Sequence, residues 1–131
     1  MANRFTLSWT VGDPTEGGNQ RDPGWSDVAR MLERLKDLAG TLTLEVIDGQ
    51  EMEAQSLQLR ADHGHYLVTL GADIGKEYEI RSSCDPDAAP SLVSILGDLW
   101  DSRMVISEFD VVISVFEEFF NTGDVSHQHL N

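Results

Sequence analysis

Two pairs of histidines have a spacing from which a metal site could be built. His63 and His65 are separated by one glycine, and His127 and His129 by one glutamine. In an extended chain each pair would place two imidazoles on the same side, as some metal sites require. The first pair falls at a predicted hairpin tip and the second in a predicted C-terminal tail, where exposed histidines are common. We therefore predict no metal site and no cofactor.

Paired carboxylates are a second possible source of chemistry, because acid–base catalysis needs two such groups held in different environments. Three close pairs occur in the chain: Asp85 and Asp87, Asp98 and Asp101, and Glu117 and Glu118. The chain has 23 Asp and Glu residues, so chance pairing is expected. A solvated acidic surface is the simpler interpretation of these pairs.

Nucleophilic and cofactor-dependent chemistry lack their usual sequence signals. The single cysteine, Cys84, has no basic neighbour in the sequence to lower its pKa, and it excludes a disulfide within the chain. The glycine-rich phosphate loops, the zinc-protease motif and the serine-hydrolase motif are absent. The first residues lack the apolar stretch of a secretory signal, and no apolar run approaches membrane-spanning length. These observations predict a cytoplasmic protein.

The charge balance says more about partners than any motif does. The 131 residues include 9 Lys and Arg against 23 Asp and Glu, which gives a net charge of −14. This excess disfavours binding to nucleic acid or to anionic membranes, and it favours a basic protein partner. The excess of negative charge is strongest in residues 82–131, which contain nine acids and one base, Arg103.

Hydrophobic periodicity predicts a single α+β domain over residues 1–126 with a flexible tail at 127–131. Alternation predicts strands over 4–11, around 42–46 and 57–59, and over 66–70 and 77–81, while 91–96 fits either a strand or a short helix. Residues 12–24, with four glycines and two prolines, are predicted to be a long polar connection. Apolar residues at steps of three and four predict helices over 23–39 and 107–121. We expect a mostly antiparallel sheet of five or six strands with both helices on one face.

The helix ends carry further sequence signals. Asp22 and Pro23 resemble a cap followed by a proline in the first turn, and Ser107 is a preferred N-cap residue. Gly123 provides a stop for the second helix. Among the tryptophans, Trp100 lies in a turn-like sequence and is either a core residue or an interface anchor. The acidic C-terminal part then suggests a set of partner contacts: Asp98, Trp100, Asp101, Asp110, Glu117 and Glu118.

Several segments together resemble small bacterial immunity proteins, the antidotes of contact-dependent growth inhibition and related polymorphic toxin systems. The segments are Pro-Gly-Trp-Ser-Asp-Val, Thr-Leu-Thr-Leu-Glu-Val, Tyr-Leu-Val-Thr-Leu, Ile-Leu-Gly-Asp-Leu-Trp and the closing Glu-Glu-Phe-Phe-Asn-Thr-Gly-Asp-Val-Ser, which together span residues 23–126. The resemblance implies a non-enzymatic cytosolic protein that binds one cognate toxin domain and covers its active site or substrate groove.

The favoured hypothesis is therefore an immunity protein, monomeric or weakly dimeric, that neutralises a basic nuclease or another nucleic-acid-modifying toxin. The alternative is an acidic secretion chaperone that binds an effector protein. Such chaperones usually begin with a helix and form dimers, whereas this sequence begins with a predicted strand. An enzyme that uses the paired histidines for metal binding is a third possibility.

Overall fold

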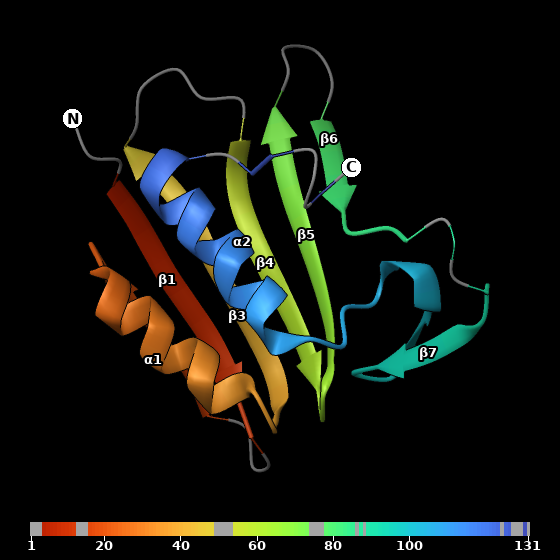
Figure 1. Ribbon diagram of the computed structural model, residues 1–131. Coiled ribbons are helices and arrows are strands. Elements are labelled where there is room, and N and C mark those ends of the chain that lie inside the picture. Colours follow the sequence, from red (N-terminus) through yellow and green to blue (C-terminus); the bar gives the residue numbers. More distant parts are fainter. Residues whose placement is uncertain are drawn as a thin grey trace.

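The computed structural model describes residues 4–12, 16–48, 54–73, 78–85, 87, 89–123, 125, 126 and 130. Over these residues the chain forms a six-stranded antiparallel sheet, a separate two-stranded hairpin and two α-helices (Figure 1). The elements are β1 (Arg4–Val11), β2 (Glu16–Arg21), α1 (Trp25–Leu35), β3 (Ala39–Asp48), β4 (Ala54–Asp62), β5 (His65–Asp73), β6 (Tyr78–Ser82), β7 (Leu92–Ile95), β8 (Asp98–Asp101), the short 3₁₀ helix η1 (Ser102–Met104) and α2 (Phe109–Thr122).

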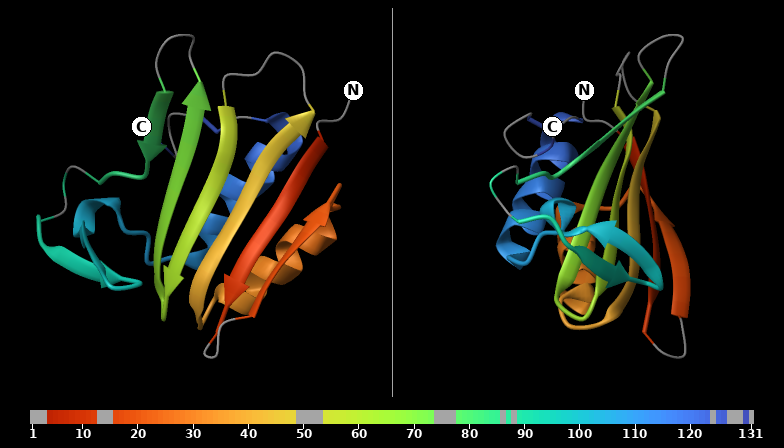
Figure 2. Two further views of the ribbon diagram at one scale, coloured as in Figure 1. Left: turned by 180° about the vertical axis from the view of Figure 1, so that it is seen from behind. Right: turned by 90° about the vertical axis from the view of Figure 1, so that its right-hand side faces the viewer.

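The large sheet has the order β2-β1-β3-β4-β5-β6, and both α-helices cover the same face of it (Figures 1 and 2). The α+β class and the placement of the helices are thus as predicted. The register aligns one leucine from each of four neighbouring strands: Leu7, Leu44, Leu57 and Leu70. All four are fully buried beneath the helices, together with Phe116 and Phe119 of α2. Burial of this apolar layer is the main driving force for folding.

Helix α1 is shorter than the predicted 23–39 at both ends. The helix begins after Gly24, whose backbone N–H donates to Asp27 Oδ2 at 2.9 Å. Its end is set by the sheet, because the buried Tyr66 donates its hydroxyl proton to the carbonyl of Lys36. Burial raises the pKa of this phenol, with a smaller contribution from Asp37. Beyond a short bend, Ala39 already belongs to β3.

Helix α2 begins at Phe109, so the predicted cap at Ser107 is wrong. The N-cap residue is Glu108, whose side chain makes no capping hydrogen bond. The preceding Ile106 is held in a β-bridge to Tyr66, which keeps the chain extended up to the helix start. The predicted stop at Gly123 is confirmed. This glycine adopts a positive φ of 79°, and its N–H donates to the carbonyl of Phe119 at 2.7 Å.

The prediction of a polar connection over 12–24 is wrong for residues 16–21, which form the edge strand β2. In its pairing with β1, Gly18 lies opposite Trp9. A Cβ atom added to Gly18 would lie 2.6 Å from the Trp9 ring, so the indole occupies the space that a side chain would fill. Packing of an aromatic ring over a strand glycine compensates for the missing side chain. The glycine-rich composition of this segment thus led to a loop being predicted where a strand forms. Residues 13–15 lie outside the described part of the chain.

The ambiguous segment 91–96 contains a strand, and the turn-like sequence around Trp100 contains another. Strands β7 and β8 pair with Val93 opposite Trp100 and Ile95 opposite Asp98. Gly97, with a φ of 87°, forms the turn between them. Ile95 is fully buried, and so is Leu67 of β5, which points away from the helices. Strand β7 contacts β4 and β5, so the hairpin covers this end of the sheet.

A buried arginine ties the C-terminal part of the chain to the sheet. Arg81 of β6 is only 6% exposed. Its Nη2 atom donates to the carbonyls of Val125 and Leu130, at 2.7 and 2.8 Å. Leu130 is fully buried, and it is the one described residue of the segment 127–131 that the sequence predicts to be a tail.

At the start of β3, Gly40 leaves no space for a side chain. A Cβ atom added to Gly40 would lie 2.0 Å from the Thr10 carbonyl oxygen and 2.8 Å from Leu35 Cδ2. We expect Gly40→Ala to lower the free energy of unfolding by about 3 kcal/mol, because β1 and β3 would have to separate. Urea denaturation measures the change. The matched control, Gly17→Ala, places its Cβ in ordinary contact at 3.4 Å and should change stability by less than about 0.5 kcal/mol. Equal stability of Gly40→Ala and the unmodified protein would contradict the close approach.

Candidate binding surface and pocket

The sheet face turned away from the helices is polar, and we call it the open face. Its side chains alternate with those of the core along each strand. On β1 and β3 they include Thr6, Ser8, Thr10, Thr41 and Thr43. Thr10 and Thr41 are joined by a hydrogen bond of 2.8 Å between their hydroxyl oxygens. The open face therefore offers hydrogen-bonding groups rather than a second apolar layer.

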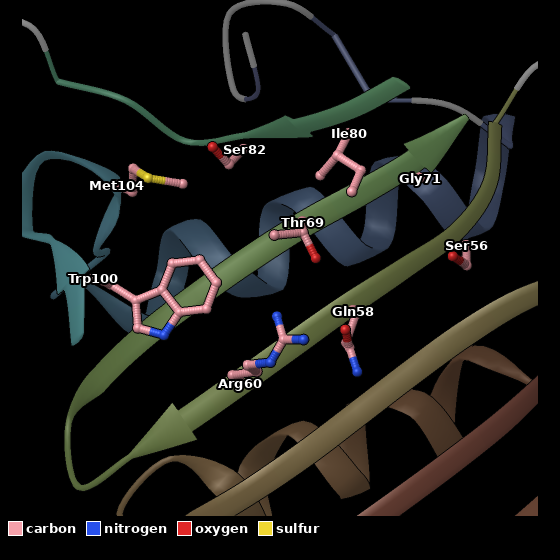
Figure 3. Close-up of a pocket in the computed structure, with 9 residues that line it drawn as sticks. All are labelled: Ser56, Gln58, Arg60, Thr69, Gly71, Ile80, Ser82, Trp100 and Met104. Atoms are coloured by element: carbon pink, nitrogen blue, oxygen red, sulfur yellow. The ribbon is translucent and has the colours of Figure 1, made fainter. Parts of the chain in front are cut away.

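Over the β4–β6 end of the open face, β8 and η1 enclose a pocket of about 350 Å³ (Figure 3). Its lining comes from four parts of the chain: Ser56, Gln58 and Arg60 of β4, Thr69 and Gly71 of β5, Ile80 and Ser82 of β6, and Trp100 and Met104. The strands supply a mainly polar floor, whereas the indole stands over the opposite side (Figure 3).

Arg60 and Trp100 face each other across this pocket. The guanidinium carbon of Arg60 lies 5.5 Å from the centre of the Trp100 ring, within cation–π range (Figure 3). Among the described residues, no carboxylate pairs with Arg60, whereas Arg30, Arg34 and Arg103 each bind one. The indole Nε1 is buried and has no acceptor in the described part of the chain.

The structure does not gather the six predicted partner contacts on one surface. Asp98, Trp100 and Asp101 lie on β8, beside the open face. The other three, Asp110, Glu117 and Glu118, lie on α2, behind the sheet as Figure 3 is viewed. The two groups are close in sequence but are separated by the sheet itself.

The six residues also differ in what their side chains already do. The carboxylates of Asp98, Asp110 and Glu117 are exposed and have no partner among the described residues. Glu118 accepts a hydrogen bond from the Ser126 backbone N–H at 2.8 Å, which helps to hold the chain beyond α2. Asp101 caps η1 by accepting from the Arg103 N–H at 2.9 Å, and the Arg103 guanidinium binds it through Nε and Nη2.

The most exposed apolar side chains of the hairpin were not predicted from the sequence. Leu92 of β7 is 69% exposed and Leu99 of β8 is 66% exposed. Because Leu92 pairs with Asp101 and Leu99 with Ser94, the two leucines are diagonal neighbours on the outer face of the hairpin. We call Leu92 and Leu99 the hairpin patch. Exposed Asp98 precedes Leu99 in the same strand. The alternation of side chains along two paired strands would have predicted that both leucines lie on one exposed face.

The structure describes only the first of the two histidine pairs. His63 lies in the β4–β5 turn with a φ of 46°, its Nδ1 atom is 3.3 Å from the Asp37 carbonyl oxygen, and His65 begins β5. His127 and His129 lie outside the described residues. Within the described residues, no group of three or more His, Cys, Asp or Glu side chains is arranged to hold a metal ion.

Comparison with other proteins places the chain in a family and confirms the fold. The chain belongs to DUF6911, a family of unknown function, which it matches over residues 8–129. A crystal structure of a hypothetical protein from Neisseria gonorrhoeae is similar, with a TM-score of 0.76 and 15% sequence identity over 90% of this chain and 87% of that one. At this identity the likeness concerns the fold alone. No curated protein matches the chain. In the described part of the chain, no helix has the length and apolar content needed to cross a membrane.

The ion pair on η1 gives a prediction about pH. Hydrogen bonds from the Arg103 side chain and backbone lower the pKa of Asp101 from 3.8 to about 2. Because the folded-state pKa is depressed, the stabilisation by this pair is present above about pH 4 and is lost as the pH falls toward 2. We expect the Asp101 carboxyl carbon to titrate near pH 2 by NMR, and Arg103→Gln to raise the midpoint toward 3.8. The control Arg34→Gln, which removes the partner of Glu16, should leave the midpoint in place. A midpoint near 3.8 in the unmodified protein would show that the pair does not form in solution.

Proposed function

We propose that this protein is a cytoplasmic immunity protein, which binds one cognate toxin domain and covers its basic active-site surface. The toxin would be a nuclease or another nucleic-acid-modifying enzyme. The observation that carries the proposal is the hairpin patch, whose two leucines are about two-thirds exposed in a chain of net charge −14. Contiguous exposed apolar side chains rimmed by polar groups are typical of protein–protein contact sites.

The hairpin is held in one conformation before any partner arrives. Ile95 is fully buried and anchors the hairpin to the sheet, and the backbone N–H of Leu96 donates to Asp62 Oδ2 at 3.0 Å. At its other end, the Ser102 N–H donates to the Ser91 carbonyl at 2.8 Å. A pre-ordered surface loses little conformational entropy on binding, so more of the interaction energy contributes to affinity.

Charge complements the apolar contact. An enzyme that acts on nucleic acid needs a basic groove for phosphate, and an acidic inhibitor is attracted to that groove. Asp98 adjoins Leu99 at the hairpin turn, but alternation places its side chain on the other face of the hairpin, with Trp100. Asp110 and Glu117 are on α2, on the other side of the sheet. We assign the α2 carboxylates to long-range attraction, which is strongest at low salt because the screening length is then greater.

A secretion chaperone is the second candidate, because the hairpin patch could instead join two copies of this chain. Light scattering separates the two functions. A monomer or weak dimer fits the immunity protein, whereas an obligate dimer that Leu99→Ser dissociates would favour the chaperone.

The direct test is co-expression with the protein encoded immediately upstream of this gene. We expect that its C-terminal domain kills cells when expressed alone, that this protein restores growth, and that the two proteins purify as a stoichiometric complex. Killing that continues during co-expression, or turnover of a metabolite by this protein alone, would overturn the proposal.

The hairpin patch should control how long the complex lasts. Full burial of a leucine contributes about 1.5–3 kcal/mol, so we expect the double variant Leu92→Ser, Leu99→Ser to raise the dissociation rate at least about tenfold. Surface plasmon resonance with the captured toxin domain measures this rate. The matched control is Leu38→Ser, which changes an exposed leucine on the bend after α1 and should dissociate as slowly as the unmodified protein. An unchanged dissociation rate in the double variant would place the contact elsewhere.

The exposed carboxylates should control how fast the complex forms. We expect the triple variant Asp98→Asn, Asp110→Asn, Glu117→Gln to associate about threefold to tenfold more slowly at low salt and to lose much of the salt dependence. Asp101 and Glu118 are left unchanged because their carboxylates already bind Arg103 and the Ser126 N–H. The charge-matched control changes Glu33, Asp37 and Glu45, which are also exposed, to their amides and should slow association less. Stopped-flow traces that are identical for the triple variant and the unmodified protein would remove these residues from the site.

A further inference from the structure

The pocket beneath β8 contains two hydrogen-bond donors that the described chain does not satisfy. One is the Arg60 guanidinium, which has neither an ion pair nor a hydrogen bond among the described residues, although the chain contains 23 acids. The other is the Trp100 Nε1–H, which is buried without an acceptor. Of the two, the Trp100 N–H is the buried one, and a buried donor without an acceptor is rare and unfavourable, because it loses its hydrogen bond to water and gains nothing in return. The Arg60 guanidinium is half-buried and faces the pocket. One acceptor group would satisfy both donors once the indole or the Arg60 side chain shifts to uncover Nε1.

The rest of the lining fits a ligand that has one polar end and one apolar end. Side chains of Ser56, Gln58 and Thr69 extend from the strands that form the floor (Figure 3). On the β6 side, Ile80 is 67% exposed and lies in the same lining as the Met104 thioether (Figure 3). A volume of about 350 Å³ is within the range of small-molecule sites.

We propose that this pocket binds an organic monocarboxylate. The planar Arg60 guanidinium would hold the carboxylate through paired hydrogen bonds, and the Trp100 N–H would donate to the same group. The apolar part of the ligand would lie against Ile80 and Met104. A single negative charge is favoured over a phosphate or a dicarboxylate, because the net charge of −14 repels anions in proportion to their charge. This site is independent of the immunity function proposed above.

Binding should be visible in tryptophan fluorescence. The surface of Nε1 is covered in the structure, so a carboxylate reaches it only after the indole or the Arg60 side chain shifts. The environment of the Trp100 ring therefore changes on binding, while Trp9 and Trp25 lie against the core on the helix side of the sheet. Loss of the fluorescence response in Trp100→Phe would assign the signal to this residue.

The experiment titrates the purified full chain with phenylacetate, followed by fluorescence and calorimetry. We expect saturable binding with a dissociation constant at or below about 1 mM, and no binding of neutral phenylacetamide. Arg60→Gln should weaken binding about tenfold or more, because a hydrogen bond to a charged group is lost. Arg60→Lys retains the charge but not the planar fork, so its affinity for phenylacetate should lie between those of the unmodified protein and Arg60→Gln. Trp100→Phe should weaken calorimetric binding about fivefold, because it loses one neutral donor.

The matched control is Arg21→Gln. Arg21 lies on the same open face, on β2 at the far edge of the sheet, and has no ion pair among the described residues. This variant removes the same charge and should bind phenylacetate as the unmodified protein does. Thermal melts verify that all variants fold. The proposal is overturned if phenylacetate shows no saturation up to about 10 mM, if phenylacetamide binds equally well, or if Arg60→Gln binds as tightly as Arg21→Gln.

Two sources could supply such a carboxylate, a free metabolite or the C-terminus of a polypeptide. A peptide that ends in phenylalanine, with either a free or an amidated C-terminus, distinguishes them. Binding of the free-ended peptide at least about tenfold more tightly than phenylacetate assigns the site to a chain terminus, and weaker binding assigns it to a small molecule. Because no toxin is present in this assay, its failure would leave the immunity function standing, and failure of the co-expression test would leave the carboxylate site standing.

Discussion

The row of buried leucines across β1, β3, β4 and β5 is the constraint on which the rest of the molecule depends. Leu7, Leu44, Leu57 and Leu70 are in register and fully buried under the two helices. A slip of one residue in any strand would turn its leucine away from the helices, at a cost of several kcal/mol. The same register therefore fixes every side chain on the open face, including Arg60, which follows Leu57 and Leu59 in β4. Packing of the apolar face under the helices therefore also fixes the positions of the side chains that form the pocket floor.

The elements with strong periodicity were predictable from the sequence, and the exceptions have physical causes. Alternation predicted β1 and β5, and the phenylalanine stripe predicted α2. Strand β2 was missed because its glycine is covered by the ring of Trp9, a side chain from another strand. Strand β8 was missed because a glycine and an aspartate come directly before its apolar residues. The end of α1 and the start of α2 differ from the prediction because of contacts with Tyr66, which no local signal records.

The binding surfaces were less predictable than the fold. Composition indicated an acidic surface. The predicted contacts on β8 and α2 were grouped because they are close in sequence, but in the structure the sheet separates these two elements. Spacing could not show that Asp101 and Glu118 already have partners. The pocket unites Arg60 with Trp100, forty positions later, through pairing of β7 with β8 and packing of β7 on β4. Only the topology brings them together. It also gives the hairpin two distinct faces, with leucines outward and Trp100 inward.

The hydrogen bonds of Arg81 imply an order of events during synthesis. Its two backbone acceptors, at Val125 and Leu130, lie 44 and 49 positions further along the chain. When β6 leaves the ribosome, these carbonyls have not yet been made, and a buried guanidinium without acceptors would be strongly disfavoured. We therefore expect β6 to join the sheet only after Val125 and Leu130 have been made, with β5 as the provisional edge until then. Since Ile80 and Ser82 of β6 line the pocket, a nascent chain would bind nothing there before that stage of synthesis.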